Sequence, residues 1–96
     1  MVKMKNQDVI EAFVGYDIKP GIESHTGNLY ITMSGRKLMN YNTVLAQRVG
    51  NEIIVNSTKY SVTTSKIQTW LRGAAGDFVE TTKHVPINTQ DLKEYV

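Results

Sequence analysis

Apolar residues near the amino terminus recur at the spacing of an α-helix. Four of them share one helical face: Val9, Ile10, Phe13 and Val14. Asp8 lies in the first turn, where a negative charge interacts favourably with the helix dipole, and the side chain of Asn6 can cap the first free amides. The pattern predicts a helix over residues 7–14 that ends at Gly15 and is followed by a polar loop.

From residue 28 to residue 62 the apolar positions alternate with polar ones, which is the period of a β-strand. Turn signals divide this stretch at Gly35 and at the Gly50-Asn51 pair, whose residues tolerate positive φ. We therefore expect strands over residues 29–33, 38–49, 52–56 and 59–62. Strands joined in this order by short turns predict an antiparallel meander of three or four strands.

A second helix is predicted after the meander. Ser65 and Gln68 match the spacing of a capping box, in which a hydroxyl and a glutamine side chain satisfy free backbone amides at a helix start. An apolar stripe follows at helical spacing: Ile67, Trp70, Leu71 and Ala74. We expect Trp70 to anchor the core and Gly73 or Gly76 to end the helix.

Residues 77–96 carry a weaker pattern, which predicts an edge strand around Phe78 and Val79 and a short last helix containing Leu92 and Tyr95. The predicted fold class is α+β, a small antiparallel meander packed with an amino-terminal helix and a helix after the meander. The helices would cover one face of the sheet. The other face would then be open for binding or for forming a homodimer.

The composition fits one domain. A chain of 96 residues with 41% hydrophobic residues supports one core, so we expect a single domain over residues 1–96, with residues 1–5 and 93–96 frayed. Cysteine is absent from the sequence, which excludes disulfides and thiolate metal sites and is typical of the cytoplasm. The sequence lacks a signal-peptide pattern and a membrane-length apolar run, so we expect no membrane partner.

Charge is unevenly distributed along the chain. Between residues 36 and 72 there are six basic residues against one acid, a net charge of +5, whereas the rest of the chain is −3. The basic residues are Arg36, Lys37, Arg48, Lys59, Lys66 and Arg72. They could form a basic surface that attracts nucleic acid. Alternatively, they are solvated residues at strand edges, where positive charge discourages aggregation.

Residue patterns for catalysis and metal binding are missing. His25 and His84 belong to no metal-ligand or hydrolase motif, and the carboxylates form no pair suited to acid–base catalysis. The sequence also lacks a glycine-rich phosphate loop and a nucleophile elbow. We therefore predict no catalytic residue, no metal and no cofactor, and a binding protein rather than an enzyme.

The densest polar cluster runs from a predicted strand into the start of the second helix. A helix start offers free amides and partial positive charge, which suits an anion or phosphate. The candidate ligand residues are Thr63, Thr64, Ser65, Lys66 and Gln68, with Tyr41 and Tyr60 for stacking. Helix capping and the preference of strands for threonine also explain this pattern. A DNA-recognition helix here would need a preceding helix, where the pattern predicts a strand.

Residues 41–46 (YNTVLA) and 60–68 (YSVTTSKIQ) resemble an uncharacterised family of short proteins from tailed phages and mobile elements of Gram-positive bacteria. The likeness covers residues 38–72. A histidine often stands in that family where this chain has Ile67, so any role of that histidine would be missing here. The resemblance implies a phage or prophage origin and supplies no reaction.

Small phage accessory proteins commonly act by binding and blocking host machinery. The resemblance therefore implies a stoichiometric inhibitor of a host protein in the bacterial cytoplasm, such as a nucleic-acid-dependent defence nuclease complex. The alternative is a direct binder of nucleic acid or of a nucleotide signal. That binder would use the basic residues and the helix start at residues 63–68.

Overall fold

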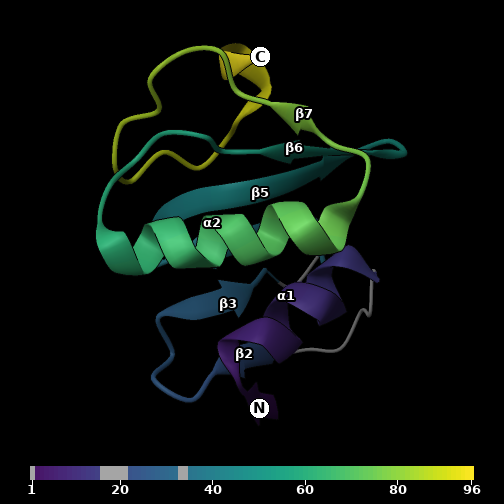
Figure 1. Cartoon of the computed structure of the whole chain (residues 1–96), viewed down its shortest axis with the longest axis vertical. Coiled ribbons are helices and arrows are strands. Elements are labelled where there is room, and N and C mark those ends of the chain that lie inside the picture. The colour runs from purple at the N-terminus through teal and green to yellow at the C-terminus, as the bar shows by residue number, and fades with distance from the viewer. Residues whose placement is uncertain (1, 16–21, 33–34) are drawn as a thin grey trace.

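The computed structural model describes residues 2–15, 22–32 and 35–96, which form one seven-stranded mixed sheet and two α-helices (Figure 1). The elements follow the chain as β1 (Val2–Met4), α1 (Asn6–Val14), β2 (Ile22–Ser24), β3 (Leu29–Ile31), β4 (Lys37–Asn40), β5 (Thr43–Val49), β6 (Glu52–Val55), α2 (Val62–Ala75) and β7 (Val79–Glu80). A short 3-10 turn, Lys93–Tyr95, follows. The predicted α+β class is confirmed.

The strands lie in the sheet in chain order, β1 to β7. Strands β2 to β6 form an antiparallel meander, whereas β1 pairs in parallel with β2, and β7 pairs in parallel with β6. A parallel pair needs a crossover, and α1 and α2 supply the two crossovers. The predicted meander of three or four strands was therefore too small, because the sheet has five antiparallel strands and a parallel strand at each edge.

The start of α2 differs from its prediction. The helix begins at Val62, and its cap is Ser61, whose Oγ accepts a hydrogen bond of 3.1 Å from the amide of Thr64. The predicted capping box of Ser65 and Gln68 is therefore wrong by one helical turn. The predicted strand over residues 59–62 is also wrong, since residues 56–61 form no strand and lead into α2. The predicted cap of α1 by Asn6 is not seen, because Lys5 occupies that position without a side-chain bond.

A turn at Tyr41 and Asn42 divides the predicted strand over residues 38–49 into β4 and β5. The backbone of Tyr41 has φ of 55°, a left-handed conformation that is unusual for a residue with a large side chain. Tyrosine is not a turn signal, so the sequence pattern predicted one continuous strand across this position. The predicted hairpin at Gly50 is confirmed, with Val49 opposite Glu52.

Both helices cover one face of the sheet, where they contact each other (Figure 1). The core on this face joins apolar residues of α1, α2 and five strands, including Phe13, Leu38, Leu45 and Leu71. Trp70 is not the predicted core anchor, since it is 40% exposed. The buried positions of α2 are Thr64, Ile67, Gln68 and Leu71, so the inward stripe is rotated away from Trp70 and includes two polar residues.

The opposite face of the sheet is covered by residues 81–96, which we call the carboxyl-terminal strap. Val85 and Leu92 of the strap are fully buried against Met39, Val44 and Ile54. The expectation that this face is open is therefore wrong over these residues. The predicted last helix is only the 3-10 turn Lys93–Tyr95.

Gln47 of β5 fixes the strap to the sheet. Its Oε1 accepts a 2.8 Å hydrogen bond from the amide of Leu92, and its Nε2 donates a 3.1 Å bond to Oδ1 of Asp91. The pKa of Asp91 lies below its ordinary value, mainly because the amide of Lys93 donates to the carboxylate and also because Gln47 does.

Among the residues that the structure describes, no helix is long and apolar enough to cross a membrane.

Candidate functional site at the amino end of α2

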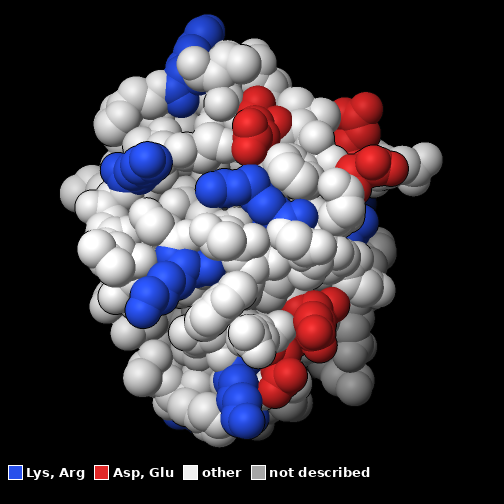
Figure 2. Space-filling model, viewed as in Figure 1, with Lys and Arg blue, Asp and Glu red and all other residues white. Residues whose placement is uncertain are grey.

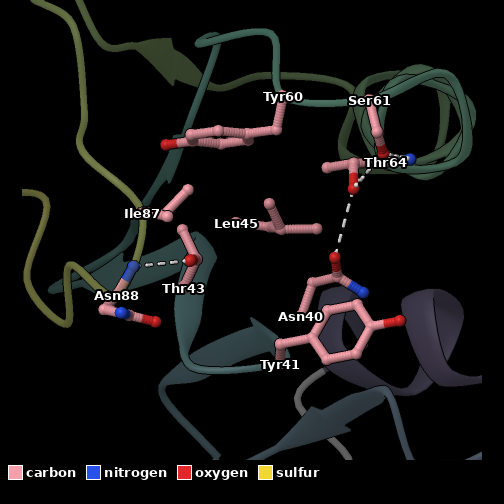
Figure 3. A pocket seen from close by; sticks show the side chains of 9 residues that line it. All are labelled: Asn40, Tyr41, Thr43, Leu45, Tyr60, Ser61, Thr64, Ile87 and Asn88. Atoms are coloured by element: carbon pink, nitrogen blue, oxygen red, sulfur yellow. Dashed lines mark hydrogen bonds between the residues drawn. The ribbon is translucent and has the colours of Figure 1, made fainter.

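Two adjoining pockets, of about 290 and 350 Å³, meet at the amino end of α2. They share Asn40, Tyr41, Ser61 and Thr64. The walls of the first pocket come from the β4–β5 turn, from the first turn of α2 with the residues before it, and from residues 87–88 of the strap (Figure 3). The second pocket is also lined by Asn6 of α1 and by residues 26 and 28–29. We call the combined hollow the α2 groove. It is built by segments that are far apart in the sequence.

A chain of hydrogen bonds forms one wall of the α2 groove (Figure 3). The Oγ of Ser61 donates to Oγ1 of Thr64 over 3.0 Å, and that hydroxyl donates to Oδ1 of Asn40 over 3.2 Å. The amide nitrogen of Asn40 in turn donates to the carbonyl of Asn28 over 3.2 Å. Because each polar group already has a partner, this wall is fixed in shape before any ligand arrives.

The two tyrosines of the α2 groove differ in their freedom. The hydroxyl of Tyr60 donates to the carbonyl of Val85 and accepts a 2.9 Å bond from Asn56, so its ring is held at the groove wall. The side chain of Tyr41 is 63% exposed and lies at the groove mouth. Tyr60 is therefore a structural wall residue, whereas Tyr41 presents its ring to solvent.

Unusual backbone geometry concentrates at the α2 groove. Among the described residues, Tyr41 and Asn88 are the non-glycine residues with positive φ, at 55° and 67°, and both line this groove. Such conformations are unfavourable and persist where the surrounding structure imposes them, which is frequent at functional sites. The amide of Asn88 is held by a 2.8 Å bond to Oγ1 of Thr43 (Figure 3).

An exposed apolar rim accompanies the α2 groove. Tyr41, Val62 and Ile87 are 63%, 77% and 68% exposed, which makes them the most exposed large hydrophobic residues in the described part of the chain. Tyr41 and Ile87 line the groove, and Val62 directly follows Ser61. Except for the tyrosines, the described residues that line the groove have no ionisable side chain. The surface therefore suits apolar and hydrogen-bonded contacts rather than charge.

Four of the seven predicted ligand residues line the α2 groove: Tyr41, Tyr60, Thr63 and Thr64. Ser65 lies within the first turns of α2, and Lys66 is exposed on the helix outside the groove. Gln68 is 2% exposed, and its Nε2 donates to the carbonyls of Asn56 and Thr58 over 2.6 and 2.9 Å. The structure thus gives Gln68 the role of holding residues 56–58 against α2.

Arg48, which was predicted in the basic surface, is engaged inside the fold. Its guanidinium donates to the carbonyls of Phe13 and Val14 over 2.9 and 3.0 Å, and it lies 5.7 Å from the centre of the Phe13 ring. These carbonyls end α1, where a positive charge is favourable. Arg48 therefore closes the carboxyl end of α1.

The predicted basic residues form no single group. Arg36, Lys37 and Arg48 line one pocket together with Asp91 and Lys93, whereas Nε of Arg72 lies 3.9 Å from Oε1 of Glu80. Lys59 lines a different groove, between residues 57–59 and residues 81–84. Figure 2 shows basic and acidic side chains mixed over the face that carries α2. The +5 segment therefore does not form one continuous basic surface on this face.

Sequence reasoning missed Asn40, Ser61, Ile87 and Asn88 as groove residues. Ser61 had a detectable signal, because a serine three residues before Thr64 fits a helix cap as well as Ser65 does. Ile87 and Asn88 had none, since they reach the groove only through the path of the strap.

The described residues contain no cluster of histidine and carboxylate side chains that could hold a metal ion.

A scan against protein-family models found no match, and searches of curated proteins and of solved structures also returned none. The resemblance to short phage proteins therefore stays a prediction.

Proposed function

We propose that the protein is a non-enzymatic accessory protein of phage origin that acts by stoichiometric binding to a host protein. The α2 groove and its rim are the proposed contact surface. The observation that carries the proposal is the exposure of Tyr41 and Ile87, with Val62 next to Ser61, at a groove whose described lining residues carry no acidic or basic side chain. Exposed apolar groups that surround a shaped hollow are typical of protein interaction sites.

The rigidity of the α2 groove supports this proposal. Its wall is fixed by the bonds between Ser61, Thr64 and Asn40, so little conformational entropy is lost when a partner binds. Tyr41 supplies a large exposed ring, and tyrosine is enriched among the residues that dominate binding energy in interfaces. A partner would insert an apolar side chain into the groove and cover Tyr41 and Ile87.

The class of partner comes from the sequence resemblance. Small phage accessory proteins commonly act on host machinery, and a nucleic-acid-dependent defence complex in the bacterial cytoplasm is the partner that we propose.

The test is affinity capture from a Gram-positive host lysate, followed by calorimetric titration of the captured protein. We expect a complex of defined stoichiometry. The double variant Tyr41→Asn/Ile87→Ser should weaken it by at least about tenfold, because each lost hot-spot side chain contributes roughly 1–2 kcal/mol. Val49→Ser is the matched control, since Val49 is also exposed but lies at the far end of β5. Equal affinity of the double variant and the control would refute the proposed surface.

A direct binder of a nucleotide or of nucleic acid is the second candidate. It is favoured by the exposed ring of Tyr41, on which a base could stack, in a groove that Asn88 also lines. Fluorescence-anisotropy titrations with single-stranded and duplex DNA at two salt concentrations test it. Salt-dependent binding that the Tyr41 variant abolishes would select this candidate over the host protein.

A further inference from the structure

A second groove, of about 290 Å³, lies between residues 57–59 and residues 81–84. Hydrogen bonds join the two segments. The amide of Ser57 donates to Oγ1 of Thr81 over 3.0 Å, and the amide of Val85 donates to Oγ1 of Thr58 over 2.8 Å. We call this hollow the strap groove, because the carboxyl-terminal strap forms one of its sides. Its shape is thus set by the fold and not by the surface side chains alone.

Three nitrogen-bearing side chains gather at the strap groove, those of Lys59, Lys83 and His84, and all three residues are exposed. None of the described residues that line it is an aspartate or a glutamate. The upper left of the face in Figure 2, where both segments lie in Figure 1, carries basic side chains and no acidic ones. Two lysines in one groove repel each other unless an anion lies between them.

The hydroxyls of the strap groove add further donors. In the described part of the chain, Thr58 and Thr81 each accept a backbone hydrogen bond through Oγ1, while their own hydroxyl protons have no acceptor. The Oγ of Ser57, enclosed beside them, has no hydrogen-bond partner among the described residues. The side chains at the groove therefore offer many more donors than acceptors, and a ligand that fits must supply acceptor oxygens.

We propose that the strap groove binds the phosphoryl group of a small molecule, either free phosphate or the phosphate of a nucleotide. A phosphoryl group carries negative charge and several acceptor oxygens, which match the two ammonium groups, the imidazole and the hydroxyls of Thr58 and Thr81. The site lies apart from the helix start at which the sequence predicted an anion, because Lys66 does not line the strap groove. This proposal does not depend on the partner proposed for the α2 groove.

In the experiment, the protein is titrated separately with inorganic phosphate and with adenosine monophosphate. Binding is monitored through the NMR chemical shifts of the backbone amides. We expect saturable shifts confined to residues 57–59 and 81–84. Lys59→Gln/Lys83→Gln should weaken binding by about tenfold, because it removes both ammonium groups. Lys5→Gln/Lys66→Gln is the control, since it removes the same charge from exposed lysines outside the groove and should leave the affinity unchanged.

Each outcome decides the proposal. Tighter binding of adenosine monophosphate than of phosphate supports a nucleotide ligand, and equal binding supports free phosphate. The proposal is overturned if neither probe gives saturable shifts, or if the control variant weakens binding as much as Lys59→Gln/Lys83→Gln does. Binding of a single-stranded oligonucleotide without any binding of the two small probes also overturns it, because a backbone-binding surface would then explain the lysines.

Discussion

At the scale of single residues, Tyr41 and Gln68 show what sequence patterns can and cannot assign. Both were predicted as ligand residues, yet Gln68 is buried and bonded to two carbonyls, whereas Tyr41 is exposed at the groove mouth. For Gln68, the sequence pattern is the same whether the side chain points to solvent or to a neighbouring carbonyl. The side chain is buried because residues 56–58 pass over α2, and the sequence does not reveal that path.

Tyr41 also allows binding to be separated from stability. Because a left-handed conformation is less unfavourable for asparagine than for tyrosine, Tyr41→Asn should raise the free energy of unfolding by roughly 0.5–1 kcal/mol. The same change removes the exposed ring and should weaken the proposed complex. Urea denaturation and calorimetry measure the two effects, and Tyr41→Phe is the control that keeps both the strain and the ring. A loss of stability in Tyr41→Asn would contradict this account of the turn.

At the scale of elements, the sequence predicted the two helices and the central strands, but not the edge strand β1 or its neighbour β2. The helices were found because their apolar period extends over several turns. Strands β1 and β2 have three residues each, and neither lies within a longer alternating run such as the one that revealed the equally short β3. The edge strand expected around Phe78 and Val79 is confirmed as β7, which begins three residues after Gly76, the carboxyl-terminal cap of α2, and pairs with β6.

The cap of α2 gives a prediction at this scale. Ser61→Ala removes the hydroxyl that accepts from the amide of Thr64, and we expect the free energy of unfolding to fall by about 1 kcal/mol. Ser65→Ala is the matched control, because Ser65 lies inside the helix, where alanine is the better helix former. Chemical denaturation of both variants measures the difference. Destabilisation by Ser65→Ala and not by Ser61→Ala would place the helix start at Ser65, as the sequence pattern suggested.

At the scale of the whole molecule, the carboxyl-terminal strap decides how much of the sheet is exposed. The sequence predicted a layer of helices on one face, which is confirmed, and an open second face, which is not. Val85 lies in a segment without a clear period, and the weak pattern assigned Leu92 to a short helix, so the sequence did not predict that both residues pack on the sheet. Gln47 holds the strap through two hydrogen bonds, and such pairing across 45 residues leaves no local trace in the sequence.

Leu92 tests the contribution of the strap to stability. Its side chain is fully buried, so Leu92→Ala should lower the free energy of unfolding by roughly 2–4 kcal/mol through lost burial and an added cavity. Val96→Ala is the control, because Val96 is 48% exposed and should tolerate the change. Thermal and urea denaturation compare the variants. A similar, small effect of both would mean that the strap is only loosely held.

The strap also has a consequence for the order of folding. Its contacts with β5 join positions about 45 residues apart, whereas the hairpins of the meander close over much shorter distances. Long-range contacts need a larger loop to close, so we expect the meander to form first and the strap to dock after the main barrier. Leu92→Ala should then speed unfolding and leave the refolding rate nearly unchanged, which stopped-flow kinetics can measure. A folding molecule would thus expose Met39, Val44 and Ile54 until the strap docks, and in that interval the protein is most prone to aggregation.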